Sequence, residues 1–336
     1  MPPFSFGRAV FPAGESEPFL DYAGMEPPPG AGRPNDTRPG RAPGDRRETN
    51  PRTWILLWAG VVAASFSAIL IRYASGADPL AISFWRCAAG AALLLPALGL
   101  RVQGVSRREI SLAVVAGLFL ALHFATWITS VRLTTIAASV LLVSTTPVFT
   151  AAAGRVLFGE RLGWSVWGGI ALALAGTAVV AGQGAAGSSL AGNGLALAGG
   201  AAAAGYVLAG GAVRRRLGIF HYAVLAYGSA ALVLLALCLA AGTPLWGYGA
   251  KTWWAIGGIV IGPQLLGHTV INFVLRDVDA TSVAVTVMAE PVVATALAFI
   301  LFGEAPSWLV YPGGVAVLAG IYFVTAARRL PEVPPE

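Results

Sequence analysis

The stretch LFGERLGW at residues 157–164 recurs as LFGEAPSW at residues 301–308. The two copies agree at five of eight positions and lie 144 residues apart. The same offset pairs further landmarks: Arg132 with Arg276, Pro147 with Pro291, Gly169 with Gly313, and Gly176 with Gly320. Because prolines, charges and tryptophans share this one register, we interpret the two stretches as equivalent points of an internal repeat.

The composition of the chain indicates a membrane protein. Of its 336 residues, 56% are hydrophobic and 11% are charged, whereas soluble chains carry about 25% charged residues. Apolar runs recur at the length of about 20 residues that a helix needs to cross the hydrocarbon layer of a bilayer. The sequence therefore predicts an all-α polytopic membrane protein.

Ten apolar segments follow residue 52, at 53–74, 79–100, 109–131, 134–157, 163–182, 193–213, 219–241, 252–275, 279–302 and 307–327. The offset pairs the third to fifth segments with the eighth to tenth, so each repeat holds five helices. Because five is an odd number, the second repeat enters the membrane from the opposite side, as in many secondary transporters. We predict ten transmembrane helices in two inverted five-helix repeats, at residues 53–182 and 193–327.

Residues 1–52 differ from the rest of the chain. They contain 11 of the 22 prolines and no sustained apolar run. Such a segment buries too little apolar surface to offset the entropy of ordering it. We predict a disordered cytoplasmic tail, and leave open whether translation starts at Met1 or at Met25.

The distribution of basic residues predicts the orientation. With the N-terminus inside the cell, the inner connections contain ten arginines and the outer connections contain three basic residues. The excess of basic residues in cytoplasmic loops predicts that both termini are cytoplasmic, in the inner membrane of a bacterial type of cell. Topology explains the net charge of +6, and no nucleic-acid partner is expected.

The repeated frame also resembles a known family. A proline inside a helix, then LFGE, then a tryptophan and spaced glycines occur at 139–182 and again at 282–326. With LWAGVVAASFSAILIRY (57–73) and PLAISFWRCAAG (79–90), this frame resembles the EamA domain of the drug/metabolite transporter superfamily. The resemblance covers about residues 53–327 and implies a 5+5 arrangement of helices and movement of small metabolites. The structural residues of the frame are Pro147, Pro291, Gly159, Glu160, Gly303 and Glu304.

Glu290 is the leading candidate for a functional side chain, because ionisable residues inside a membrane span are costly and rare. It precedes Pro291, which removes a helix hydrogen bond and frees the carbonyl of Val287. An acid beside a free acceptor fits a cation, an ammonium group or an exchangeable proton. The alternative is a structural hydrogen bond between helices.

Arg86 lies inside the second segment and has three interpretations. It could grip a substrate carboxylate with its planar fork, pair with Glu290, or extend towards the membrane surface. The stretch LAYGSAAL (225–232) in the second half has no charged counterpart to it. We therefore expect the two halves to contribute unequally to a site.

Further candidates are aromatic or polar side chains at depth in the predicted bundle. His123 and His268 occupy roughly corresponding places and could relay a proton, although a hydrogen bond between helices is the favoured interpretation. Asn272 follows His268 by one turn. The aromatic candidates, which could line a cavity for flat or cationic solutes, are Trp85, Trp127 and Tyr206.

These patterns predict a secondary transporter that moves a small organic metabolite, amino-acid-like or drug-like, by alternating access, with export as the expected direction. The sequence has no ATP-binding, hydrolase or metal-site motif, so we expect no enzyme activity, cofactor or metal, and coupling to protons or to the solute gradient. The alternatives are a non-transporting membrane scaffold and a membrane protein that acts on lipid. Substrate, coupling ion, stoichiometry and oligomeric state stay open.

Overall fold

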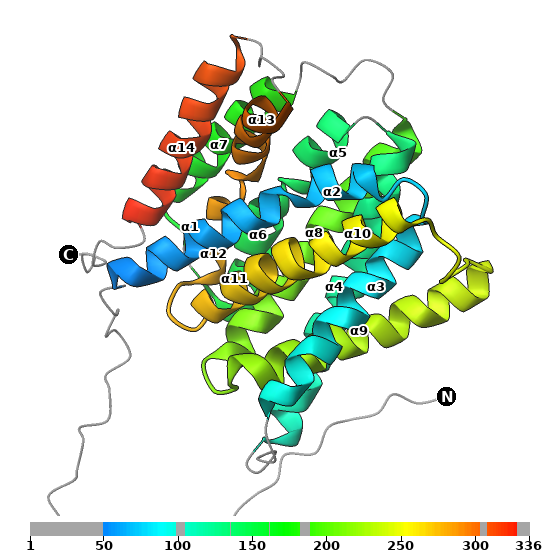
Figure 1. The fold of residues 1–336 in the computed structure, drawn as a ribbon. Coiled ribbons are helices and arrows are strands. Elements are labelled where there is room, and N and C mark those ends of the chain that lie inside the picture. Colours follow the sequence, from blue (N-terminus) through cyan, green and yellow to red (C-terminus); the bar gives the residue numbers. More distant parts are fainter. Residues whose placement is uncertain are drawn as a thin grey trace, which may run out of the picture. The chain divides into compact units, whose positions relative to one another are not determined.

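A computed structural model describes residues 50–98, 105–134, 136–160, 162–181, 189–302 and 308–327. Residues 1–49 of the predicted tail, together with Gly303 and Glu304, lie outside the described residues. Within the described ranges every regular element is a helix and there is no strand (Figure 1). The prediction of an all-α chain is confirmed.

In the part of the first repeat that the structure describes, the helices form five apolar spans. They are α1 (Pro51–Ser65) with α2 (Ser67–Tyr73), α3 (Pro79–Leu94) with the 3₁₀ turn η1 (Leu95–Leu98), α4 (Arg107–Leu133), α5 (Ile136–Val143) with α6 (Thr146–Phe158), and α7 (Trp164–Ala181). The first and fourth predicted segments are thus each interrupted, at Phe66 and at residues 144–145.

The described residues of the second repeat also form five spans. They are α8 (Leu190–Arg214), α9 (Ile219–Ala241), α10 (Ala250–Ile259) with the π-helical segment η3 (Val260–Thr269) and α11 (Val270–Val274), α12 (Ala280–Val287) with α13 (Glu290–Phe302), and α14 (Val310–Ala327). In the described residues, nine spans are long and apolar enough to cross a membrane, and Trp164–Val180 is a tenth, shorter apolar helix.

Local sequence explains where the helices begin. Pro51 and Pro79 occupy first helical positions, where the missing amide hydrogen costs nothing. The preceding residues cap these helices: Asn50 Oδ1 accepts a hydrogen bond from the amide of Arg52 at 3.0 Å, and Asp78 Oδ1 accepts one from Leu80 at 2.8 Å. These polar caps fix the entry of the chain into its first two spans.

The LFGE frame ends a helix. Gly159, with φ of 67°, adopts the left-handed conformation that stops α6. Its amide donates to the carbonyl oxygen of Arg155 at 3.1 Å. The amide of Glu160 donates to the carbonyl oxygen of Gly154 at 3.3 Å. This pattern of a glycine in left-handed conformation with two backward hydrogen bonds is a common helix C-terminal cap.

The packing of α7 on α14 shows the symmetry of the two repeats. A methyl group added to Gly176 would lie 2.5 Å from the carbonyl oxygen of Gly313, and one added to Gly320 would lie 2.5 Å from that of Gly169. The 144-residue offset relates Gly176 to Gly320 and Gly169 to Gly313. The two contacts are therefore symmetry-equivalent. The pairing runs antiparallel, as an inverted repeat requires (Figure 1).

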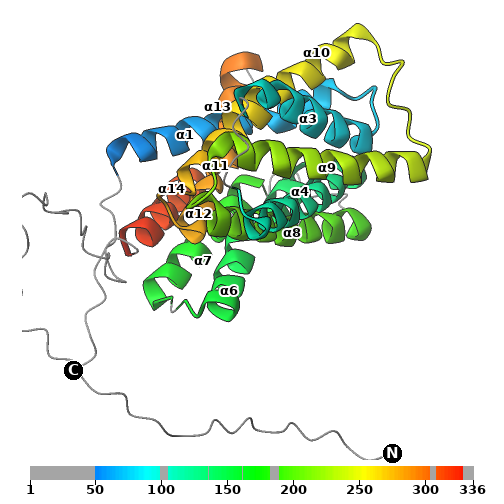
Figure 2. The same cartoon turned by 90° about the horizontal axis from the view of Figure 1, so that it is seen from below.

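Other contacts between the two repeats also occur in equivalent pairs. The first span of each repeat packs on the third span of the other, as α1 does on η3 and α11, and α8 on α4. Figure 2 shows α4 and α8 side by side. Large apolar side chains remain exposed on the outside of the bundle, among them Leu232, Ile300 and Tyr322. A lipid environment tolerates this exposure because hydrocarbon tails surround those side chains.

Candidate functional site

Two helix breaks stand at equivalent points of the repeats. The fourth span is interrupted between α5 and α6 at residues 144–145, and the ninth between α12 and α13 at residues 288–289, which is again a shift of 144. Pro147 and Pro291 follow these breaks and cannot supply the amide hydrogen that a continuous helix needs. At the first break the hydroxyl of Thr146 donates to the freed carbonyl of Val143 at 2.7 Å.

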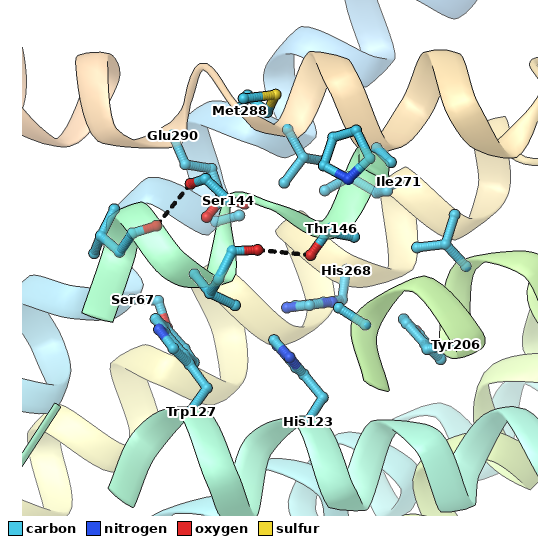
Figure 3. Close-up of a pocket in the computed structure, with 18 of the residues that line it drawn as sticks. Ser67, His123, Trp127, Ser144, Thr146, Tyr206, His268, Ile271, Met288 and Glu290 are labelled. Atoms are coloured by element: carbon cyan, nitrogen blue, oxygen red, sulfur yellow. Dashed lines mark hydrogen bonds between the residues drawn. The ribbon is translucent and has the colours of Figure 1, made fainter. Parts of the chain in front are cut away.

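A cavity of about 120 Å³ lies between the two breaks. It is lined by residues of the first, third and fourth spans and of their partners in the second repeat, the sixth, eighth and ninth spans. Figure 3 shows polar groups that point into it from both repeats: Ser67, His123, Trp127, Ser144, Thr146, Tyr206, His268 and Glu290. Both halves of the molecule therefore build one site.

His123 and Trp127 form one wall of the cavity. The rings lie almost parallel, with 5.7 Å between centroids and 7° between planes. His123 Nδ1 lies 2.9 Å from the carbonyl oxygen of Gly199. Since a carbonyl only accepts, Nδ1 carries the hydrogen, and Nε2 of the neutral ring is left as an acceptor. This bond between α4 and α8 is the helix-to-helix bond that we favoured for His123.

His268, Tyr206 and Asn272 form the opposite wall. The side-chain amide of Asn272 donates to the hydroxyl oxygen of Tyr206, and it donates to the carbonyl oxygen of His268 at 2.6 Å. Its side-chain oxygen is buried without a hydrogen-bond partner among the described residues. The His268 ring meets the edge of Phe124 at 5.3 Å between centroids.

Glu290 is half-buried at the start of α13 and lines the cavity. Of the described residues that line it, Glu290 is the only one with a carboxyl group. The sequence-based candidates Glu290, His123, Trp127, Tyr206, His268 and Asn272 are therefore brought together in one place.

Arg86 and Trp85 do not line this cavity. Arg86 is fully buried behind Phe124, with its guanidinium carbon 3.7 Å from that ring's centroid, and its Nε donates to Gln264 Oε1 at 2.9 Å. Trp85 donates its indole hydrogen to the carbonyl of Leu245 at 2.9 Å. Its ring packs at 4.5 Å from that of Trp246, so it belongs to an aromatic cluster outside the cavity.

Sequence reasoning missed several residues of the cavity, among them Ser67, Ser144, Thr146 and Met288. A signal for Thr146 was present, because the offset of 144 places it at the position of Glu290. Ser67 carried no such signal, since it depends on the interruption of the first span at Phe66.

Comparison with known proteins decides the family. The model of the EamA-like transporter family matches residues 52–182 and 190–326. The chain belongs to this family. It is therefore a multi-pass membrane protein and a membrane transporter of the drug/metabolite transporter superfamily.

Solved structures support the fold of this EamA-like transporter. One crystal structure of a protein is similar over 83% of this chain and 99% of its own, with 23% sequence identity and a TM-score of 0.70. At that identity the likeness concerns the fold alone. No curated protein matches the chain.

Proposed function

We propose that the protein is a secondary transporter that carries a small organic solute by alternating access, with the cavity between the two helix breaks as the binding site. The observation that carries this proposal is the position of the cavity. It lies at equivalent points of two inverted repeats, so a rocking motion that closes it on one side opens it on the other. We further propose that the protein resides in the inner membrane, with both termini in the cytoplasm, and works as an exporter.

The chemistry of the cavity favours binding over catalysis. The hydroxyl of Ser144 donates to the carbonyl of Val140 at 2.7 Å, and that of Thr146 donates to Val143 at 2.7 Å. A hydroxyl that gives its hydrogen to a backbone carbonyl is not activated by a neighbouring base, as a nucleophile would need to be. Coupling to protons is part of the proposal and rests on the carboxyl group of Glu290.

Cysteine labelling tests alternating access without knowledge of the substrate. We replace the buried Cys87 and Cys238 by serine and introduce Ala203→Cys, whose half-exposed side chain lines the cavity. A membrane-impermeant thiol reagent should label this cysteine in intact cells and also in inside-out vesicles. The neighbouring Ala202, 3% exposed, does not line the cavity, and Ala202→Cys should resist labelling from both sides. Labelling of Ala203→Cys from one side only would favour the scaffold alternative.

A further inference from the structure

The cavity lining holds several hydrogen-bond acceptors beside Glu290. Ser144 and Thr146 use their hydroxyl hydrogens on backbone carbonyls, at 2.7 Å each, which leaves oxygen lone pairs on the cavity side. His123 offers Nε2 as an acceptor, because its Nδ1 hydrogen bonds to Gly199 at 2.9 Å. The indole N–H of Trp127 is a donor without a partner among the described residues. The hydroxyl of Ser67 also has no partner among the described residues and can donate or accept. Together with the Glu290 carboxyl group, the acceptors can bind a solute that donates hydrogen bonds.

The two helix breaks differ at one position. In the first repeat the hydroxyl of Thr146 satisfies the carbonyl of Val143 at 2.7 Å. The offset of 144 places Glu290 at the position of Thr146 and Val287 at that of Val143. An ionised carboxylate has no hydrogen to donate, whereas a protonated one has. Since Pro291 has no amide hydrogen, an ionised Glu290 and the Val287 carbonyl together form an acceptor pair beside the cavity.

We propose that the cavity binds a small organic ammonium ion with a flat apolar body, and that the ammonium replaces a proton at Glu290. The N–H groups lie between the Glu290 carboxylate and the Val287 carbonyl, and the apolar body lies against Trp127 and His123. The exchange balances: the protonated carboxyl and the ammonium ion give the ammonium carboxylate pair and one free proton. This inference deepens the proposed function, because it names the substrate class of the same site.

The surroundings of Glu290 contain several other titratable or charged groups. His123 reaches the cavity from α4, His268 from η3 and Tyr206 from α8. Arg86, on α3, lies behind the ring of Phe124 with 3.7 Å between its guanidinium carbon and the ring centroid. Arg86 and Phe124 do not line the cavity, so a cation can enter without direct contact with Arg86, although the charge of Arg86 acts on Glu290. The Glu290→Gln variant removes only the carboxyl group and leaves all of these other groups in place.

Three probes with the same phenyl ring and two-carbon chain test the substrate class: phenethylammonium, 2-phenylethanol and 3-phenylpropionate. Their binding to the purified full-length protein is followed by tryptophan fluorescence. Phenethylammonium should bind at least tenfold more tightly than either of the others, which corresponds to about 1.4 kcal/mol. In weakly buffered solution its binding should release up to one proton per molecule bound, and acidification should weaken its binding.

Variants assign the preference to one carboxyl group. Glu290→Gln should lose the tenfold preference and the proton release, while Glu290→Asp, which keeps the charge, should retain a weaker preference. Glu109→Gln is the matched control, because Glu109 does not line the cavity and lies in the capping box with Ser106 at the start of α4. It should behave like the unmodified protein.

Other results would overturn the inference. Tighter binding of phenylpropionate, equal binding of all three probes, no binding of phenethylammonium, or a preference that survives Glu290→Gln each contradicts it. The outcome is separable from that of the proposed function. Two-sided labelling of Ala203→Cys together with a preference for the carboxylate would leave the transporter intact and remove only the substrate class. A preference for the amine together with one-sided labelling would support the substrate class and contradict alternating access.

Discussion

Arg86 is fully buried, and its burial is costly because a buried charge needs partners for its donors. Its Nε donates to Gln264 Oε1 at 2.9 Å, and its guanidinium group stacks on Phe124 at 3.7 Å from the ring centroid. Both terminal nitrogens are buried without a hydrogen-bond partner among the described residues. The guanidinium thus depends on one amide oxygen and one aromatic face, and loss of either exposes the full cost of burial.

Removal of the amide partner should therefore harm the protein more than removal of both groups. We expect Gln264→Leu to lower thermal stability by about 2 kcal/mol, because it leaves the charged Arg86 without its acceptor. The shift in melting temperature would be roughly 5 °C. The double variant Arg86→Met with Gln264→Leu should recover most of this loss, since an apolar pair replaces the whole interaction. Thermal unfolding in detergent tests the order, and a double variant less stable than Gln264→Leu alone would contradict it.

The sequence predicted part of the candidate site. Glu290, His123 and His268 stood out because polar side chains inside a membrane span are rare. The hydrogen bond between Arg86 and Gln264 could not be predicted from the sequence, because 178 residues separate the two partners along the chain. Trp85 was expected to line a cavity with Trp127, but only the fold shows that it packs against Trp246 instead.

Helix boundaries were predicted less well than helix number. The segment 252–275 was expected to be one regular helix, yet its middle is the π-helical segment η3. Pro263 lies inside η3, and a proline ring clashes with the preceding turn of an α-helix and lacks a hydrogen for it. A wider turn relieves both problems. The breaks before Pro147 and Pro291 have the same physical origin, and they place polar groups in the cavity.

The helix pair α7 and α14 depends on glycine at the points where the backbones touch. A Cβ atom on Gly176 would lie 2.5 Å from the Gly313 carbonyl oxygen, and one on Gly320 would lie 2.5 Å from that of Gly169. Backbone atoms cannot yield as a flexible side chain can. In lipid, close approach of this kind supplies much of the attraction between helices.

Single alanine substitutions should expose this requirement. We expect Gly176→Ala and Gly320→Ala each to destabilise the protein by about 1–3 kcal/mol, the usual cost of overpacking. The two losses should be similar, because the repeat makes the positions equivalent. Gly168→Ala is the control: it lies on α7, with no atom within 4 Å of an added Cβ, and alanine favours helix more than glycine does. Equal loss in all three variants, measured by thermal unfolding in detergent, would refute the packing argument.

The arrangement of the spans constrains the side on which each connection lies. Arg132, at the end of α4, donates to the carbonyls of Ser75 at 3.1 Å and Ala77 at 2.8 Å. Thr134 donates to Asn193 Oδ1 at 2.8 Å, at the start of α8. The ends of the first, third and fifth connections therefore meet at one side of the bundle. Our proposal makes this the external side, because it holds few of the basic residues.

Reporter insertions in two described connections test this orientation. Gly218 lies between α8 and α9, one residue beyond the run Arg214, Arg215 and Arg216, whereas Gly247 lies between α9 and α10. A fluorescent protein inserted after Gly218 should fluoresce, as it folds only in the cytoplasm, and alkaline phosphatase inserted after Gly247 should be active, as it matures only outside. The reciprocal insertions should be silent. The physical reason is that arginines are retained on the cytoplasmic face during insertion, so the triplet before Gly218 fixes its side and α9 carries Gly247 to the other. Activity of both reporters on the same side would mean that α9 does not cross the membrane, and the two five-helix repeats could not then be inverted.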